Sequence, residues 1–435
     1  MFLGLKIRIF GAMKSRERLI LALKHEEPDR VPIDFGALRV SSIDALAYCR
    51  LRKSLGLPDR PIRVAPQTFI NTIEYGSNIA EVEKEILDLF HVDVINVNRV
   101  LNPRGPLTET SDEWREWNVN GNLLEIHASV NITEDEDGWI LTLPDSSLVP
   151  GGKKYKMLRK DFTCIELWRK ESPLKDAKSV EDIKEFDWDL FKLRDDVLDG
   201  IKRRAEYLYA NTDYGLVLFD VGSLHANIGQ VLRGWTQWLI DLKIRRTLAE
   251  AILDRAMEVL KYNLKKYVDA IKDYIQVIGF ADDLGTQEGP QISPQLFRDV
   301  YKHRYEELFG YIKKHSKMFI LLHSDGAISP FLKDLIDVGL DAINPVQFTC
   351  RGMEPEELKK NFGEQVTFWG GGADTQNVLP YAKPEEVIKH VEKLVSIFSP
   401  GGGYVYATVH IIPGNTPPEN IIYAFKTAYE FGRYH

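Results

Sequence analysis

The C-terminal half of the chain alternates short apolar runs with longer amphipathic stretches, and this rhythm constrains the fold more than any other feature. The apolar runs are rich in Val, Ile, Phe and Tyr and span residues 216–221, 275–281, 318–323, 342–346, 367–370 and 404–408. Helical periodicity fills the gaps, over residues 236–270, 293–315, 328–338, 353–362, 384–398 and 417–432. Strands that alternate with helices in this way predict βα units and a parallel sheet.

Two further strand candidates lie upstream and bring the total to the eight that a closed barrel needs. Residues 31–35 form a short apolar run followed by a helix-like stretch at 41–55, and residues 92–97 form a second run preceded by an amphipathic stretch at 79–90. We therefore expect an α/β protein with the (β/α)₈ TIM-barrel fold. Residues 1–435 would form a single domain, with residues 1–14 as an N-terminal extension.

The region 102–165 lacks the alternation of short apolar runs and amphipathic stretches. Its polar and apolar residues alternate, and turn signals recur at Asn120-Gly121, Asp137-Gly138 and Gly151-Gly152. These features predict β-hairpins inserted after the second strand. An insertion on the carboxyl side of a barrel strand overhangs the active-site mouth, so we expect either a lid or substrate wall, or a hairpin layer without a role in function.

Composition excludes several classes of function. The 435 residues carry a net charge of −8, which argues against a nucleic-acid binder, because such a protein needs a basic face. No run approaches the roughly 20 apolar residues of a membrane helix. The three cysteines, Cys49, Cys164 and Cys350, are widely separated, which favours a cytoplasmic enzyme without a disulfide framework. We expect a small-molecule substrate, and nothing in the sequence specifies an oligomeric state.

Polar side chains recur where the predicted strands end, which is where a TIM barrel places its active site. The fourth to eighth strands are followed by carboxylates, imidazoles, amides and a glycine: Asp282, Asp283, His323, Asp325, Asn344, Gln347, Gly371 and His410. A solvated loop would more often contain Lys, Glu and Ser. These residues are therefore the candidate site.

Two histidines and one carboxylate in this set, His323, Asp325 and His410, form a three-ligand divalent metal site if they converge. Catalytic zinc and non-haem iron sites use such donors and keep one position open. The alternative is that both histidines are metal-free hydrogen-bonding or acid–base groups.

The other strand-end residues have candidate roles in catalysis or binding. We assign His323 and Asp283 to the chemistry, Asp283 as a general base or a binder of a substrate cation, and Gln347 to the orientation of a substrate carboxylate or amide. Asp282, Asn344 and Gly371 are candidate cofactor-binding residues, because glycines at 370–372 let the backbone approach a ligand closely. Loop capping is the alternative for both aspartates, and a purely structural role is the alternative for Gln347.

Several motifs in chain order resemble proteins of the uroporphyrinogen decarboxylase (URO-D) superfamily from anaerobic microbes. They are Ser15-Arg16-Glu17-Arg18, the segment His25 to Pro32, Asp282 to Gln287, His323-Ser324-Asp325-Gly326, Asn344 to Gln347, and the stretch from His410 through Ile421. The resemblance spans nearly the whole chain and implies a barrel enzyme with its site at the carboxyl ends of the strands.

The superfamily contains two main chemistries. Its decarboxylases act on uroporphyrinogen without a cofactor and grip propionates with an arginine-rich N-terminal segment, which this sequence lacks, since Arg39 and Arg63 stand in a different context. The other branch transfers methyl groups between a corrinoid carrier and a thiol, using zinc held by a His-x-Cys motif and a later Cys. At the matching positions this chain has His323, Asp325 and His410.

The resemblance therefore implies a methyltransferase with a divalent metal, most simply Zn²⁺, and a corrinoid protein as partner. Exchanging two thiolates for a carboxylate and an imidazole makes the ligand set harder and leaves more positive charge on the ion. The exchange could equally mean that the metal has been lost. A cofactor-free carboxy-lyase and a non-catalytic barrel that binds a tetrapyrrole or corrinoid are the alternatives.

Overall fold

The computed structural model describes residues 13–64, 67–69, 72–74, 78–97, 114–143, 154–160, 162–167 and 172–434. The predicted N-terminal extension at residues 1–14 therefore lies almost wholly outside the described residues, as do parts of the predicted insertion at 102–113, 144–153 and 161. Within the described residues, no helix is both long enough and apolar enough to cross a membrane.

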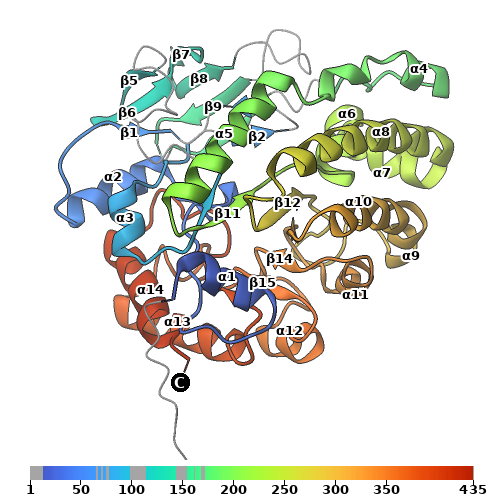
Figure 1. Ribbon diagram of the computed structural model, residues 1–435. Helices are drawn as coiled ribbons and strands as arrows, with labels where there is room; N and C mark the ends of the chain where they lie inside the picture. Colours follow the sequence, from blue (N-terminus) through green and yellow to red (C-terminus); the bar gives the residue numbers. More distant parts are fainter. Residues whose placement is uncertain are drawn as a thin grey trace, which may run out of the picture.

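Seven parallel strands form the main sheet (Figure 1). Neighbouring strands in the sheet follow one another in sequence: β4 (Val94–Asn96), β11 (Gly215–Leu218), β12 (Val277–Ala281), β13 (Phe319–His323), β14 (Ala342–Asn344), β15 (Thr367–Trp369) and β16 (Tyr404–Val405). This strand order confirms the predicted parallel βα units, although most strands are shorter than the apolar runs from which they were predicted.

Residues 33 and 34 close the sheet into a cylinder. Ile33 bridges Tyr406 and Asp34 bridges Val94, both in parallel orientation. The backbone N–H of Asp34 donates to the carbonyl of Tyr406 at 2.8 Å, and that of Asp93 donates to the carbonyl of Ile33 at 2.8 Å. The first predicted strand is thus present as two bridges, and the TIM-barrel prediction is confirmed.

Helices surround the cylinder (Figure 1). They are α2 (Ala45–Ser54), α3 (Lys84–Leu89), α5 (Asp195–Asn211), α7 (Trp235–Ile244), α8 (Arg246–Ile271), α9 (Pro294–Phe297), α10 (His303–His315), α11 (Ser329–Asp337), α12 (Pro355–Phe362), α13 (Pro384–Phe398) and α14 (Pro418–Phe431), with the short α4 (Val180–Glu185) and α6 (Val231–Arg233). Two π-helical turns, η5 (His225–Gln230) and η6 (Arg298–Lys302), interrupt them. The described residues also include the 3₁₀ turns η1 (Arg39–Ser41) and η4 (Trp188–Phe191).

The helix predictions are confirmed with two differences. The stretch 236–270 is two helices, α7 and α8, which break at Arg245, and the stretch 293–315 is divided by η6. Helices α1 (Ser15–Leu23), α4, α5 and α6 were not predicted.

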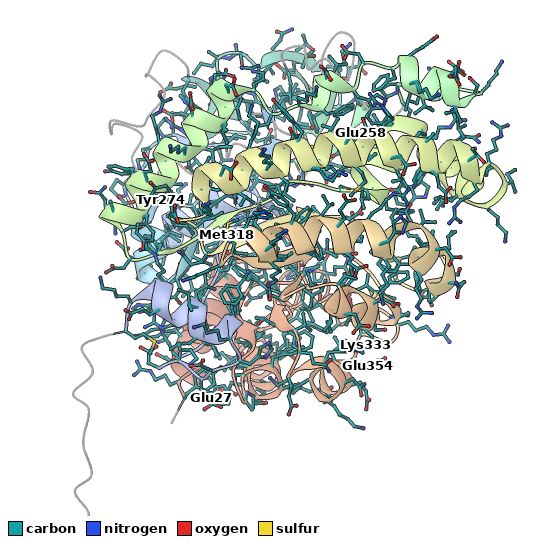
Figure 2. All side chains as sticks on the ribbon, turned by 45° about the vertical axis from the view of Figure 1, so that its right-hand side comes forward. Glu27, Glu258, Tyr274, Met318, Lys333 and Glu354 are labelled. Atoms are coloured by element: carbon teal, nitrogen blue, oxygen red, sulfur yellow. The ribbon has the colours of Figure 1, made fainter. Side chains whose placement is uncertain are left out.

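Alternating side chains fill the cylinder and its outer shell. Val217 and Leu321 point into the cylinder, where they join Trp369 and Val405, and Leu19 of α1 closes the amino-terminal end of this inner cluster. The flanking residues of the same strands face the helices. Figure 2 shows side chains between these layers, with Met318 in the interior and Glu258, Lys333 and Glu354 at the surface. Since side chains fill the cylinder, the active site of such a barrel is expected at the carboxyl ends of its strands.

Antiparallel hairpins follow β4, as predicted for the insertion. Strands β5 (Trp114–Val119) and β6 (Asn122–His127) pair through the Asn120-Gly121 turn. Strands β7 (Asn131–Asp135) and β8 (Gly138–Thr142) pair through a turn at Glu136-Asp137, one residue before the predicted Asp137-Gly138, because Gly138 already belongs to β8 and faces Asp135. Strands β9 (Lys154–Leu158) and β10 (Cys164–Glu166) extend the second sheet. Outside the insertion, β1 (Ile62–Arg63) joins β6, and β2 (Gln67–Phe69) pairs with β3 (Thr72–Glu74). The third predicted turn, Gly151-Gly152, lies outside the described residues.

Candidate functional site

A pocket opens at the carboxyl ends of the barrel strands. Its volume is about 520 Å³, part of it open to solvent, and its lining comes from residues distant in sequence: Arg39, Val40, Phe219, Asp220, Ala226, Asn227, Ala281, Asp283, His323, Asp325 and His410. Four of the predicted site residues, Asp283, His323, Asp325 and His410, thus meet in one cavity.

His323, Asp325 and His410 converge at the floor of this pocket. One ligand atom from each lies within 4.8 Å of the other two. Asp325 Oδ2 is 3.7 Å from His323 Nε2 and 3.6 Å from His410 Nε2. Ligands about 2.05 Å from a tetrahedral ion stand about 3.3 Å apart. The two carboxylate–imidazole distances exceed this by only a few tenths of an ångström, and the two imidazole nitrogens lie within 4.8 Å of each other. The donor set therefore fits a divalent ion.

The charges in the pocket shift the pKa values of His323 and His410 in opposite directions. Burial lowers the pKa of His323, but the nearby carboxylates of Asp325 and Asp283 outweigh burial and raise that pKa to about 9. Burial lowers the pKa of His410, and Asp325 offsets this only in part. Burial raises the pKa of Asp325, yet His323 and His410 hold it well below its usual range. Without metal, the site is therefore a carboxylate paired mainly with His323.

The loops after β12 and β13 hold Asp325 over His323. The backbone N–H of Asp325 donates to Asp283 Oδ1 at 3.1 Å, and that of Gly326 donates to Gln347 Oε1 at 2.9 Å. Gly326 has φ +90°, and a Cβ added there would stand 2.5 Å from the carbonyl carbon of Gly285. Glycine is therefore required where the two loops cross.

Asp282 turns away from the pocket. Its carboxylate accepts hydrogen bonds from the Ser223 hydroxyl at 2.8 Å, from the backbone N–H groups of residues 224, 225 and 226, and from the Tyr305 hydroxyl. It caps the π-helical turn η5, which brings Ala226 and Asn227 to the pocket wall. The capping alternative thus describes its contacts, and cofactor binding by Asp282 stays an untested prediction.

Three other predicted residues stand behind the pocket. Asn344, at the end of β14, contacts His323 through its amide oxygen. Gln347 reaches the pocket only through the Gly326 loop. Gly371 packs against the chain itself, because an added Cβ would lie 3.2 Å from Phe398 and 3.3 Å from Val346. The binding roles predicted for these residues stay untested.

His225 and Arg63 do not reach the pocket. The His225 ring is fully buried, and its Nδ1 accepts hydrogen bonds from the hydroxyl of Tyr301 and the indole of Trp238. Arg63 pairs with Glu125 at 3.4 Å and stacks on the ring of Trp114.

Three pocket residues were missed by sequence reasoning as site candidates. Arg39, set aside in the sequence as lying in the wrong context, is at the mouth and helps to lower the pKa of both Asp325 and His410. Asp220 lines the wall with φ +66°, a conformation that costs an aspartate energy and is common at functional sites. Asn227 was hidden because η5 has no clear sequence signature. A polar residue directly after a strand, as at Asp220, was the one available signal.

The fold has counterparts in known proteins. The family model described as uroporphyrinogen decarboxylase (URO-D) matches residues 224–431, which include His323, Asp325 and His410. Among solved structures, a methyltransferase from Methanosarcina mazei aligns with a TM-score of 0.56 at 17% sequence identity, over 96% of this chain and 99% of that one. At this identity the likeness shows a shared fold. No curated protein matches the sequence.

Proposed function

Since its residues 224–431 make this chain a member of the uroporphyrinogen decarboxylase superfamily, we propose that it is a metal-dependent methyltransferase. It would move a methyl group between a corrinoid carried by a partner protein and a thiol or similar small acceptor. One observation carries the proposal, namely the convergence of His323, Asp325 and His410 at the floor of the pocket. The methyltransferase from Methanosarcina mazei, which shares the fold, supports the reaction class.

His323, Asp325 and His410 would hold the ion, which we take to be Zn²⁺. A divalent ion with an open position supplies Lewis-acid activation of a bound thiol or similar acceptor. The carboxylate and two imidazoles leave more positive charge on such an ion than thiolates do, so the acceptor would lose its proton at lower pH.

Asp283 is suited to take up that proton. Its Oδ1 lies 3.7 Å from His323 Nε2, and its side chain is 43% exposed, so it can pass a proton on to solvent. In this proposal Gln347 acts through the Gly326 loop, where its amide oxygen holds the backbone that carries Asp325.

The inserted hairpins would form one wall of the mouth and meet the corrinoid protein. Three free cysteines favour a cytoplasmic location.

Metal content and methyl transfer test the proposal together. Purified protein should bind one divalent ion per chain and should demethylate free methylcobalamin when a thiol such as coenzyme M is added. The His323→Ala variant should lose both properties. His315→Ala, which removes an exposed histidine from the end of α10, should keep both. Unchanged metal content and activity in His323→Ala would remove the hypothesis.

A cofactor-free carboxy-lyase is the second candidate, and the position of Arg39 favours it. An arginine at the mouth can hold a substrate carboxylate through two parallel hydrogen bonds, with Asp283 or His323 as the acid–base group. Anaerobic incubation with uroporphyrinogen distinguishes the two functions, because only a decarboxylase would form coproporphyrinogen.

A further inference from the structure

Asn344 makes hydrogen bonds both to the candidate metal ligand His323 and to the backbone of Trp369 inside the barrel. Its Oδ1 is 2.7 Å from His323 Nδ1, and its Nδ2 donates to the backbone carbonyl of Trp369 at 2.8 Å. The three residues end the neighbouring strands β13, β14 and β15, which pair in parallel. Their exposed fractions are 5%, 1% and 0%, so water cannot replace either contact.

The carbonyl of Trp369 determines which end of the amide faces the histidine. A carbonyl oxygen can only accept, so the end of Asn344 beside it must be the NH₂ group, and the end beside His323 must be the oxygen. That oxygen can only accept as well. His323 Nδ1 therefore carries a hydrogen in both the neutral and the charged ring, and Nε2 is the nitrogen whose lone pair can face the pocket.

A second contact fixes Trp369. Its indole Nε1 donates to Asp34 Oδ2 at 2.8 Å, while Asp34 Oδ1 accepts from the backbone N–H of Ala37 at 2.8 Å. Asp34 is fully buried, at the point where the cylinder closes. The chain of contacts thus runs from the closure of the barrel, through β15 and β14, to the ring of His323.

We propose that Asn344 is the positioning residue of this site, which selects the Nδ1–H form of His323 and aims its Nε2 at the point shared with Asp325 and His410. Asn344 does not touch a substrate in this account, and it acts only through His323. The metal-binding consequence rests on the proposed function, whereas the form of the ring does not.

Two substitutions separate positioning from simple packing. Asn344→Leu keeps the branched shape and the number of side-chain heavy atoms but removes the acceptor, so the affinity for Zn²⁺ or Co²⁺ should fall about 10- to 100-fold, as for lost outer-sphere partners of other metal ligands. Asn344→Asp restores an acceptor for Nδ1–H and should keep the affinity within a few-fold of the unaltered protein.

Asn263→Leu is the matched control. Asn263 lies on α8, is 1% exposed, and uses both ends of its amide, since Oδ1 accepts from the N–H of Leu193 and Nδ2 donates to the carbonyl of Phe191. Its loss should lower the melting temperature much as Asn344→Leu does, with no change in metal affinity.

A metal-free readout makes the proposal independent of the proposed function. In protein labelled with ¹⁵N-histidine, His323 should give an Nδ1–H signal protected from exchange, identified by its absence in His323→Gln. The signal should be lost in Asn344→Leu and kept in Asn344→Asp and Asn263→Leu.

A signal that survives in Asn344→Leu would overturn the proposal, as would an equal loss of metal affinity in Asn263→Leu or in Asn344→Asp. If the unaltered protein binds no metal, the proposed function fails, and the NMR signal alone decides the role of Asn344.

Discussion

Replacing Gly326 by alanine should displace Asp325 and weaken the metal site without touching any ligand. The added Cβ would stand 2.5 Å from the carbonyl carbon of Gly285 and 2.6 Å from the backbone nitrogen of Thr286. Carbon atoms rest at about 3.5 Å or more, so one of the two loops must move by about 1 Å. The φ of +90° at Gly326 adds about 1–2 kcal/mol of strain for an alanine.

We expect a loss of about 2–4 kcal/mol in the free energy of unfolding and a loss of roughly 100-fold in metal affinity and turnover, because a 1 Å misplacement of a reacting group has about that effect. Isothermal titration with Zn²⁺ and a methylcobalamin assay measure both losses. Gly289→Ala is the control, since its Cβ would meet nothing within 4 Å in the loop that also carries Gly285. Wild-type affinity in a folded Gly326→Ala protein would refute the reasoning that the loop crossing holds the site.

Three further substitutions test other parts of the structure. Asp282→Ala removes the acceptor of the cap on η5 and should lower the free energy of unfolding by about 3–5 kcal/mol, measured by denaturant titration. Arg39→Gln should raise KM for an anionic substrate about 10- to 100-fold, because a hydrogen bond to a charged group contributes about 1.5–3 kcal/mol. The substitution should leave kcat and the melting temperature nearly unchanged. An unchanged KM would mean that Arg39 does not bind substrate. Burial raises the pKa of Asp44 to about 7, although the hydrogen bonds that its carboxylate accepts at the start of α2 act in the opposite direction. The contribution of Asp44 to the free energy of unfolding is therefore fully present below about pH 4, where the unfolded chain also binds the proton, and is lost as the pH rises through 7. The free energy of unfolding of Asp44→Asn should therefore rise relative to that of the unaltered protein by up to about 4 kcal/mol between pH 4 and pH 8. Parallel curves of stability against pH for the two proteins would contradict this.

The barrel could be predicted from the sequence because its strands are buried on both faces. Such strands read as continuous apolar runs, and each helix between them shows its own periodicity, as at 384–398, where the predicted and observed bounds coincide. The first strand was the hardest to identify, since only Ile33 and Asp34 form bridges. The division of 236–270 at Arg245 was also hidden, because apolar periodicity continues across the break.

The sequence predicted where the candidate site lies in the barrel, but it did not predict which way each side chain points. His323, Asp325 and His410 follow strands that the apolar runs identify, so their convergence at one end of the barrel could be expected. Asp282 and Asp283 are adjacent and alike in sequence, yet one caps η5 and the other faces the pocket. That difference depends on donors more than fifty residues away, such as Ser223, and no local pattern records it. Arg39 was set aside for the same reason, because only the folded chain brings it to the mouth.

The central claim is that His323, Asp325 and His410 together hold one divalent ion. X-ray absorption spectroscopy of the zinc-loaded protein tests it most directly, since the first shell reports the number and kind of ligands. The account predicts one ion per chain, bound by two imidazole nitrogens and one carboxylate oxygen at about 2.0–2.2 Å, with the signal lost in both His323→Ala and His410→Ala. A protein that takes up no stoichiometric ion, or that keeps the same first shell after both histidines are replaced, would contradict it.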